Sequence, residues 1–205
     1  MGNRTNSKAM RLGITQSWDS TWYASGKKYV KYLHEDLAIR DYISEKLKNA
    51  GLGKVDIRRP AGKLIVTINV ARPGVVIGRQ GSGIERMKGE LNKLVGTAID
   101  LRIMEVQSPD LNARIVARSI ANGIEKRQSP KPLARNYMNK AMQAGAKGIV
   151  IWISGRINGH KDARRLKFVE GSVPTQTLRA DVDYSLEVAH YLRVGLLGVK
   201  VWINR

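Results

Sequence analysis

The stretch Val76-Ile77-Gly78-Arg79-Gln80-Gly81, followed directly by Ser82, carries two glycines separated by two residues. Glycines at both ends let a backbone approach a sugar-phosphate chain, because no Cβ intervenes and unusual φ values cost little. Ser82 and Glu85 have capping-box spacing, which predicts that a helix begins at Ser82. The unpaired N–H groups and the positive dipole end of that helix favour phosphate oxygens. The stretch therefore indicates a loop that binds a phosphate backbone, with Arg79 as a mobile cation.

The elements on both sides of this loop follow from hydrophobic spacing. Apolar residues recur at helical intervals before and after the loop, and the alternation from Leu64 to Val70 is typical of a strand. The predicted order is a helix over 37–47 that Gly51 ends, strands over 55–57 and 64–70, a short apolar turn over 74–77, the glycine loop, a helix from 82 that Gly96 ends, and a strand over 99–104. The predicted inward faces of the two longer helices are Leu37, Ile39, Tyr42, Ile43 and Leu47, and Ile84, Met87, Leu91 and Leu94.

The glycine cluster fits the common nucleotide-binding motifs poorly. A phosphate-binding NTPase loop is excluded, because no Gly-Lys-Ser or Gly-Lys-Thr follows the glycines. A dinucleotide fingerprint fails too, since Gly81-Ser82-Gly83 has no third glycine at the required offset. An isolated GXXG tetrapeptide is more often an ordinary turn, so the flanking helices and strands are needed to favour a binding loop.

A second domain is predicted to begin at Ser108-Pro109-Asp110, which combines an N-cap, a first-turn proline and an acid at the positive dipole end. Ser129-Pro130 opens another helix, and Gly145 ends it. The predicted inward residues are Leu111, Ile115, Ile120 and Ile124 in the first helix and Leu133, Tyr137, Ala141 and Ala144 in the second. Strand candidates follow at 148–157, 164–170, 178–188 and 197–204. Two helices on a mixed, mostly antiparallel sheet would form a second core.

Charge indicates the kind of partner. Lys and Arg number 36 against 17 Asp and Glu, which leaves a net charge of +19 over 205 residues. Such an excess repels itself unless a polyanion neutralises it, so nucleic acid or an anionic membrane is expected. A membrane is the weaker alternative, because the longest strongly apolar run, 149–153, is too short to span a bilayer and no signal-peptide pattern is present. The basic first 28 residues lack the Arg-rich stripe of a transit peptide, so an arm that lies on RNA is favoured.

The positive charge is concentrated toward the C-terminus. Residues 1–35 carry 6 basic and 2 acidic groups, residues 36–107 carry 13 and 8, and residues 108–205 carry 17 and 7. More than half of the excess therefore lies in the last segment, where extensive contact with the anionic partner is expected. The absence of cysteine excludes disulfides, thiolate zinc sites and cysteine nucleophiles, and it suits a reducing cytoplasm.

Several polar clusters allow a functional and a structural interpretation. A basic hairpin around Gly159-His160 is favoured as an RNA contact over a plain solvated face. Its cations are Arg156, Lys161, Arg164, Arg165 and Lys167. The cations Arg114, Arg118, Lys126 and Arg127 line the polar side of a predicted helix and would extend this surface. Asp181 and Asp183 could mimic a metal or acid–base pair, but pairing with Arg179 or other nearby cations is favoured.

Aromatic and histidine residues point to packing rather than to catalysis. His34, His160 and His190 are scattered without ligand spacing, so no metal site is expected. Trp152 and Trp202 lie in predicted strands, where core or partner-protein packing is favoured over base stacking.

The order of elements around the loop resembles a type II KH domain over residues 36–107, and KH domains clamp about four backbone nucleotides with a GXXG loop. The resemblance extends over almost the whole chain to the family of small-subunit ribosomal protein three. The matching stretches are Met10-Arg11-Leu12-Gly13-Ile14, Ser20-Thr21-Trp22-Tyr23-Ala24, Ala144-Gly145-Ala146-Lys147-Gly148, Ser154-Gly155-Arg156, Thr177-Leu178-Arg179-Ala180-Asp181-Val182-Asp183-Tyr184 and Gly198-Val199-Lys200-Val201-Trp202-Ile203.

This resemblance implies a structural protein of the small-subunit head. Such a protein binds small-subunit rRNA, contacts neighbouring ribosomal proteins and helps line the channel through which mRNA enters. In that family, the helix that corresponds to the one opening here at Ser129-Pro130 carries basic residues that are implicated in gripping mRNA. The matching cations here are Lys131, Arg135 and Lys140, and the first two share one helix face because they lie four residues apart.

The chain departs from the family pattern at three places. Arg79-Gln80 stands where many relatives have two lysines, and Pro132 stands where they often have arginine. Asn6-Ser7 occupies a position where many bacterial members have a residue followed by proline. These departures bear on the loop, on the mRNA-gripping helix and on the arm, whose Lys8 and Arg11 are expected to contact RNA.

The sequence thus predicts an α+β protein with three parts. These are a basic N-terminal arm and lead-in over 1–35, a type II KH domain (α-β-β-α-α-β) over 36–107, and a C-terminal domain over 108–205 with two helices on a mostly antiparallel four-stranded sheet. The predicted activity is RNA binding. The protein is expected to act as a single copy, without catalysing a reaction, holding a cofactor or binding a membrane. An alternative is an enzyme that uses its KH domain only for substrate delivery. Such an enzyme would need a carboxylate cluster, a nucleophile or a nucleotide loop, and the sequence points to none of these. A free-standing RNA chaperone is a third possibility.

Overall fold

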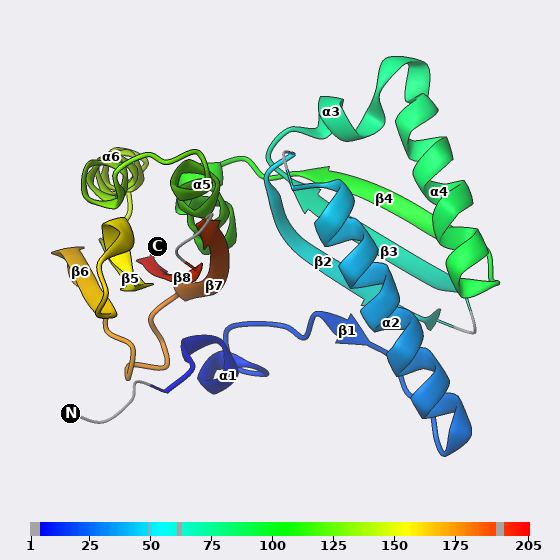
Figure 1. Ribbon diagram of the computed structural model, residues 1–205. Helices are drawn as coiled ribbons and strands as arrows, with labels where there is room; N and C mark the ends of the chain where they lie inside the picture. The colour runs from blue at the N-terminus through cyan, green and yellow to red at the C-terminus, as the bar shows by residue number, and fades with distance from the viewer. Residues whose placement is uncertain (1–4, 49, 61–62, 192–194) are drawn as a thin grey trace. The chain divides into compact units, whose positions relative to one another are not determined.

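A computed structural model describes residues 5–48, 50–60, 63–191 and 195–205, which form two compact units (Figure 1). The central unit is Trp18–Gln107, and the terminal unit combines the residues up to Ser17 with Ser108–Arg205. The arm predicted over 1–35 is therefore divided between the two units. The terminal unit is discontinuous in sequence, and the central unit is inserted into it.

The central unit is a four-stranded sheet with helices on one face (Figure 1). Its elements are β1 (Ser20–Thr21), α2 (Lys27–Lys46), β2 (Leu52–Arg58), β3 (Leu64–Val70), α3 (Pro73–Ile77), a 3₁₀ turn (Arg79–Gly81), α4 (Ser82–Val95) and β4 (Ile99–Glu105). The strand order is β1-β2-β3-β4, with β2–β3 antiparallel and both β1–β2 and β3–β4 parallel. This is the predicted order of helix, two strands, short helix, glycine loop, helix and strand.

Alternation along β3 builds the core of the central unit. Leu64, Val66, Ile68 and Val70 are buried, while the residues between them point to the other face of the sheet. Complete burial of each such side chain stabilises the fold by about 1.5–3 kcal/mol. The inward faces predicted for the helices are confirmed in α2 by Ile39, Ile43 and Leu47 and in α4 by Met87 and Leu91. Leu37 and Leu94 were wrongly predicted to be inward, because their side chains are 50% and 56% exposed.

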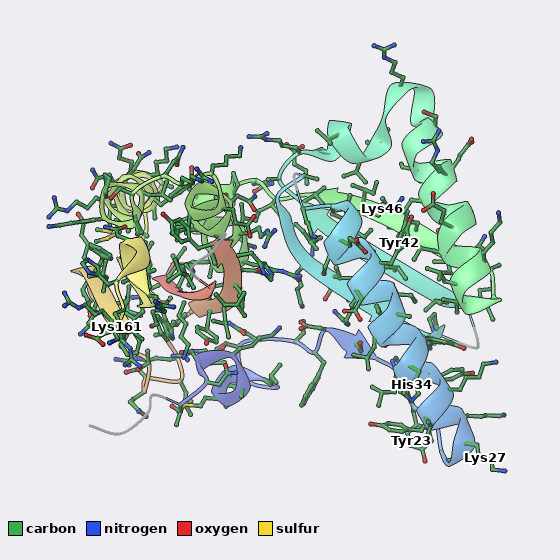
Figure 2. The ribbon with its side chains drawn as sticks, in the orientation of Figure 1. Tyr23, Lys27, His34, Tyr42, Lys46 and Lys161 are labelled. Carbon is green, nitrogen blue, oxygen red and sulfur yellow. The ribbon has the colours of Figure 1, made fainter. Side chains whose placement is uncertain are left out.

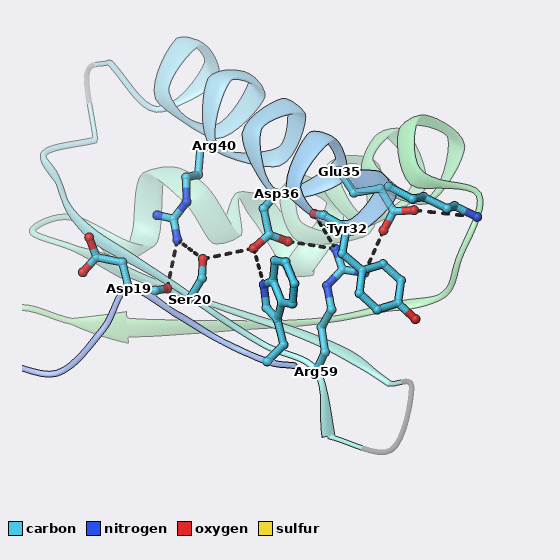
Figure 3. A network of polar contacts seen from close by, with 9 residues as sticks. Asp19, Ser20, Tyr32, Glu35, Asp36, Arg40 and Arg59 are labelled. Atoms are coloured by element: carbon cyan, nitrogen blue, oxygen red, sulfur yellow. Dashed lines mark hydrogen bonds and ion pairs between the residues drawn. The ribbon is translucent and has the colours of Figure 1, made fainter. Parts of the chain in front are cut away.

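The helix α2 begins ten residues before the predicted start near Leu37, because a polar network holds its first half (Figure 3). Its buried Asp36 accepts hydrogen bonds from Ser20 Oγ at 3.0 Å and from Trp22 Nε1 at 2.8 Å. Arg59 of the segment after β2 forms ion pairs of 2.7 Å with Glu35 and 2.8 Å with Asp36. The inward side of this half is thus polar and aromatic, so it has no apolar periodicity to detect.

The terminal unit is a second four-stranded sheet, antiparallel throughout, with two helices on one face. Its elements are α1 (Ser7–Arg11), a 3₁₀ turn (Pro109–Leu111), α5 (Ala113–Glu125), α6 (Pro130–Gln143), β5 (Gly148–Gly155), a 3₁₀ turn (Ile157–Gly159), β6 (Arg164–Gly171), β7 (Val182–Tyr191) and β8 (Gly195–Asn204). The strand order is β6-β5-β8-β7. The two helices and the four strands match the predicted C-terminal domain.

Two details of the helices in the terminal unit differ from the prediction. Ser108-Pro109-Asp110 leads into a 3₁₀ turn, and Asn112 caps α5 by accepting hydrogen bonds from the N–H groups of Arg114 at 3.1 Å and Ile115 at 3.3 Å. In α6, Ala144 was wrongly predicted to be inward: the helix ends at Gln143 and Ala144 is exposed. The other predicted inward residues are confirmed, since Ala141 is buried and Leu133 and Tyr137 pack partly buried against the core, to which Ala134 and Met138 also contribute.

The other face of the terminal sheet carries a small aromatic cluster. Trp202 is buried, and its ring centroid lies 5.0 Å from that of Trp152 and 5.1 Å from that of Tyr184. Val150 and Val182 complete the buried part. The predicted packing role of the two tryptophans is therefore confirmed for the molecule's own core. Arg165 covers the cluster, with its guanidinium carbon 5.0 Å from the centroid of Trp152.

A buried arginine fastens the N-terminal arm to the terminal unit. Arg11 of α1 has no exposed surface, and its guanidinium donates to a set of backbone carbonyl oxygens. The acceptors are the carbonyls of Ser7, Pro174, Thr175, Thr177 and Ala180, at 2.7 to 3.3 Å. These carbonyls shape the loop before β7, which explains why the strand predicted from residue 178 begins only at Val182.

Tyr42 and Glu90 join the two long helices of the central unit. Tyr42 donates a hydrogen bond to the Glu90 carboxylate, and Lys46 Nζ lies 3.1 Å from the same carboxylate. Burial, together with the hydrogen bond and charge of Glu90, raises the pKa of Tyr42 to about 12. The hydrogen bonds from Tyr42 and Lys46 lower the pKa of Glu90. The neutral phenol and the ionised carboxylate are thus both favoured around neutral pH, which maintains the contact between α2 and α4.

The carbonyl cage around Arg11 yields a stability prediction. Arg11→Met keeps much of the side-chain volume but removes every donor, so buried carbonyls lose their partners and the unfolding free energy of the terminal unit should fall by about 2–4 kcal/mol. Hydrogen exchange should accelerate over 7–11 and 174–182 and stay unchanged over β3. The control is Arg79→Met, the same change at an exposed residue. Equal protection of 174–182 in the two variants would contradict the role of the cage.

Candidate nucleic-acid interface

The glycine loop lies between two helices of the crossover that joins β3 to β4. Gly78 ends α3 with φ 69°, and Gly81 precedes α4 with φ 84°. Both values lie in a region that residues with a Cβ rarely adopt, so each turn requires glycine. Between them, the side chain of Arg79 is exposed, whereas the side chain of Gln80 lies outside the part of the chain that the structure describes. The predicted placement of the loop between two helices is confirmed.

Two glycines of the loop differ in what surrounds them. An added Cβ at Gly81 would meet no atom within 4 Å, so this side of the backbone is open. An added Cβ at Gly83, in the first turn of α4, would lie 2.5 Å from the Val76 carbonyl oxygen and 2.9 Å from that of Ile77. Gly83 therefore lets α3 and α4 approach each other, while Gly81 leaves room for a ligand. Sequence patterns did not reveal this role of Gly83, although its position beside the GXXG motif was a signal.

The beginning of α4 is confirmed at Ser82, but the predicted capping box is wrong. The N-cap residue is Gly81, which has no side chain to accept from the helix amides. Ser82 Oγ instead donates to the carbonyl oxygen of Arg79 at 2.9 Å. The first N–H groups of a 14-residue helix thus receive no side-chain cap at the loop, and the positive end of the helix dipole lies there. This arrangement favours an anion.

Apolar and basic side chains surround the loop. Val75 is 64% exposed and Ile77 is 36% exposed, so both aliphatic groups beside Gly78 are available to a ligand. Arg79 and Arg86 are exposed cations on the loop and on α4, and Glu85 is the acid in the first turn. The site combines backbone donors, a mobile cation and apolar contact surface, which are suited to a sugar-phosphate chain with its bases.

The basic hairpin predicted in the terminal unit is the β5–β6 hairpin, and its strand cations are divided between the two faces of the sheet. Arg165 stacks on Trp152, and Lys167 is the register partner of Trp152, so both lie on the face of the aromatic cluster. Arg164 alternates with them along β6 and lies on the helix side. The positive charge of this hairpin is therefore divided between the two faces of the sheet.

The connection between β5 and β6 carries the remaining two cations of the hairpin. Arg156 donates to the His160 carbonyl at 3.1 Å, which orders the turn. Figure 2 labels Lys161 in this connection. The five predicted cations of the hairpin are all exposed, as contact with a polyanion requires.

Helix α6 presents the second predicted group of cations. Lys131, Arg135 and Lys140 are exposed, while the opposite side of the helix packs on the sheet. Lys140 Nζ lies 5.2 Å from the ring centroid of Tyr137. Pro132 is the third residue of α6, within the first turn where N–H groups have no intrahelical acceptor, so it does not interrupt the helix. Lys131 and Arg135 therefore remain on one face.

The cations predicted on the N-terminal arm differ in accessibility. Arg11 is completely buried with its donors engaged by carbonyl oxygens, so it cannot reach an external phosphate; its prediction as an RNA contact is corrected to a structural role. Lys8 is half-buried on α1. The sequence shows that Arg11 is positively charged, but only the fold shows that its side chain points inward.

The cations predicted along α5 are partly neutralised within the terminal unit. Arg114 and Arg118 lie 3.6 and 3.8 Å from Glu187, so they contribute less to an open cationic surface than predicted. Lys126 and Arg127 follow the end of α5 and are exposed. The cationic surface of this helix is therefore confined to its C-terminal end.

The two aspartates considered as a metal or acid–base pair have a structural role. Asp181 and Asp183 pair with Arg205 at 3.9 and 2.8 Å, rather than with Arg179. Asp183 also accepts a hydrogen bond of 2.9 Å from the N–H group of Ala113. In the described ranges, no group of three or more His, Cys, Asp or Glu side chains could hold a metal ion.

Family comparisons agree with the two units. Residues 38–111 match the model described as KH domain, and residues 120–203 match the model described as Ribosomal protein S3, C-terminal domain. The small ribosomal subunit protein uS3 of Streptococcus suis (strain 05ZYH33) is 45% identical over 205 residues, which cover 100% of this chain and 94% of the relative. The uS3 proteins of Streptococcus pyogenes serotype M1 and Streptococcus agalactiae serotype III (strain NEM316) are 44% identical with the same coverage.

A KH domain joined to a domain of two helices on an antiparallel sheet defines an RNA-binding structural protein of the α+β class. The chain belongs to the family of small ribosomal subunit protein uS3. This is the family that the motifs in the sequence resembled. Within the described residues, every helix is too short or too polar to cross a membrane.

The contrast between two glycines of α4 tests the geometry of the loop. Gly83→Ala forces α3 and α4 apart and should destabilise the central unit by about 1–3 kcal/mol. Gly89→Ala, in the same helix with nothing within 4 Å of an added Cβ, should stabilise it by about 0.5–1 kcal/mol through helix propensity. Urea unfolding followed by circular dichroism measures both changes. Similar effects of the two substitutions would refute the close approach of the helices at Gly83.

Proposed function

We propose that this protein is a structural constituent of the small-subunit head that holds small-subunit rRNA through its glycine loop and its exposed cations. The observation that carries the proposal is the uncapped beginning of α4 beside the open backbone at Gly81. Its relatives are small ribosomal subunit proteins of the uS3 family, and the RNA of such a subunit would supply the anion. The net charge of +19 supports the same partner.

The loop would act as a clamp on a phosphate backbone. The amides at the beginning of α4 donate to phosphate oxygens, and the missing Cβ of Gly81 permits the close approach. Val75 and Ile77, both exposed, give the bases an apolar surface, and Arg79 adds a cation at the tip. A GXXG loop of this kind clamps about four nucleotides in KH domains. Contacts to phosphates position the RNA on the protein but do not recognise the base sequence of the RNA.

The exposed face of α6 is proposed as a contact for mRNA near the channel through which it enters. Lys131 and Arg135 lie on one side of the helix, and the first-turn position of Pro132 leaves that face intact. The cations of the β5–β6 hairpin are proposed as rRNA contacts on both faces of the sheet. Neighbouring proteins of the small-subunit head would contact the terminal unit as well.

A substitution at Gly81 tests the clamp. Gly81→Asp adds a Cβ and a negative charge where a phosphate would lie, so the full-length protein should bind a six-nucleotide single-stranded RNA about tenfold more weakly, equal to about 1.4 kcal/mol. Changes in the amide NMR shifts of Gly78 and Ser82 on RNA addition should be lost with the affinity.

The matched control for this substitution is Gly96→Asp. Gly96 also has positive φ (71°) and no atom within 4 Å of an added Cβ, but it lies at the other end of α4. It should reduce affinity less than twofold. If both variants bound RNA equally, or if Gly81→Asp bound as well as the unchanged protein, the clamp would be rejected.

Salt dependence tests the cations of α6. The logarithm of the RNA-binding constant should fall with the logarithm of salt concentration by about 0.7 to 0.9 for each phosphate neutralised. Lys131→Ala and Arg135→Ala should each reduce this slope by about that amount. Lys46→Ala serves as control, because Lys46 is already paired with Glu90. A slope unchanged by the α6 substitutions would remove that helix from the RNA-binding surface.

Sedimentation distinguishes this proposal from a free-standing RNA chaperone. The proposed function requires the protein to cosediment with small ribosomal subunits in a sucrose gradient at physiological salt. A protein that remains at the top of the gradient, while still binding RNA, would fit a chaperone instead.

A further inference from the structure

The connection between β5 and β6 contains an asparagine in the left-handed region of backbone conformation. Asn158 lies in the 3₁₀ turn Ile157–Gly159 with φ 54° and ψ 24°, and it is one of two non-glycine residues with positive φ in the described ranges. Asparagine tolerates this conformation better than most residues do. Its side chain is exposed, and no hydrogen bond to its carboxamide is formed among the described residues.

The residue after Asn158 is a glycine, and this pair is chemically reactive. The peptide nitrogen that follows an asparagine can attack the side-chain carbonyl carbon of that asparagine, and a glycine has no Cβ to hinder the attack. The N–H group of Gly159 donates a long hydrogen bond of 3.3 Å to the Arg156 carbonyl oxygen. Both Asn158 and Gly159 are exposed, and such turns open locally at a small cost in free energy. The two reacting atoms can therefore meet by rotation within the turn.

A second Asn-Gly pair in the same chain is shielded by the fold. Asn122-Gly123 lies inside α5, where Gly123 is buried and an added Cβ would lie 2.6 Å from the Leu133 side chain. The N–H group of a residue inside a helix donates to the carbonyl four residues earlier. The backbone there cannot turn toward the asparagine side chain unless the helix unwinds. The same two residues are thus accessible in the turn and held in the helix.

We propose that Asn158-Gly159 is a site of spontaneous deamidation, and that this modification weakens the binding of RNA by the β5–β6 hairpin. In the first step, the nitrogen of Gly159 loses its proton and bonds to the side-chain carbonyl carbon of Asn158, while Nδ2 of Asn158 takes up a proton and leaves as ammonia. Water then opens the resulting five-membered succinimide at either of its carbonyls. The products are aspartate and isoaspartate, so one water is consumed for each ammonia released.

Either product changes the charge of the hairpin, and isoaspartate also changes its shape. From Arg156 to Lys167 the chain carries five cations and one acid, Asp162, so a new carboxylate removes part of a local positive excess. Isoaspartate routes the backbone through the former side chain, which lengthens the turn spanned by the hydrogen bond of 3.1 Å from Arg156 to the His160 carbonyl. Lys161 lies in the same connection (Figure 2). A carboxylate among these cations would repel the phosphates that they bind.

The effect on binding rests on the proposed contact of the hairpin with rRNA, whereas the reaction itself requires only the exposed turn. An RNA strand that contacts Arg156 and Lys161, on the two sides of Asn158, would also hold the backbone of the turn in place. Deamidation is therefore slower in the assembled subunit than in the free protein. Unassembled copies become weaker RNA binders with time, and assembled copies are protected.

Mass spectrometry of the full-length protein, incubated in mildly alkaline buffer, tests the reaction. Trypsin releases Asn158 in the peptide 157–161 and Asn122 in the peptide 119–126, so one sample reports on both Asn-Gly pairs. In the folded protein, Asn158 should deamidate at least about tenfold faster than Asn122, because reaction at Asn122 requires local unfolding of α5. In urea the two rates should converge. Labelling by an isoaspartyl methyltransferase identifies isoaspartate in the peptide 157–161.

Two substitutions at the same position test the effect on RNA binding. Asn158→Asp introduces the charge of the product, whereas Asn158→Gly permits the same positive φ and removes the reacting carboxamide. Asn158→Asp should bind a transcript of small-subunit rRNA about two- to fivefold more weakly than the unchanged protein, and Asn158→Gly should bind equally well. After long incubation the unchanged protein should lose affinity, and Asn158→Gly should keep it. Equal rates at Asn158 and Asn122 in the folded protein, or an unmodified peptide 157–161, would overturn the proposal.

Removal of a cation separates this inference from the proposed function. Lys161→Ala should weaken binding to the same transcript, because it removes one cation of the hairpin. If Lys161→Ala weakened binding and Asn158→Asp did not, the hairpin contact would stand and the effect of deamidation would be rejected. If neither substitution changed binding, the hairpin would not be an RNA contact and both would fail. Deamidation at equal rates in small subunits and in the free protein would reject the protection by RNA.

Discussion

Parallel pairing of β3 with β4 is the constraint on which the central unit depends. Parallel neighbours cannot be joined by a tight hairpin, so the chain must cross over the sheet between Val70 and Ile99. That crossing contains α3, the glycine loop and α4, and the close approach of its two helices at Gly83 leaves the beginning of α4 exposed at the loop. The same connection that satisfies the topology of the sheet therefore positions the loop for which phosphate binding is proposed.

Positive charge serves two physical roles in this molecule. Cations on α6 and on the β5–β6 hairpin are exposed, and they form the proposed surface for a polyanion. Arg11 and Arg59 are instead internal: Arg11 donates to the backbone carbonyls before β7, and Arg59 joins the segment after β2 to Glu35 and Asp36 of α2. A buried guanidinium is stable in such places because oxygen acceptors surround it. The amino-acid composition does not distinguish these buried arginines from the exposed ones.

The discontinuous terminal unit makes the arm part of a folded core. Because the chain begins on the terminal unit, passes through the central unit and returns, two segments join the units. The carbonyls that receive Arg11 shape the loop leading into β7, whose Tyr184 packs with Trp202 in the aromatic cluster. The arm therefore supports the sheet that carries the basic hairpin, rather than being an appendage that only RNA would order.

Local patterns in the sequence determined most of the secondary structure and the place of the loop. The alternation of β3 and the glycines at 78 and 81 depend on residues close in sequence, and such signals are legible because period and backbone freedom are local properties. The beginning of α2, the burial of Arg11, the cap at Asn112 and the exposure of Leu37 depend on partners far away in the chain. Only tertiary structure decides these, because whether a side chain meets solvent, a carbonyl or a carboxylate is set by which distant segments pack beside it.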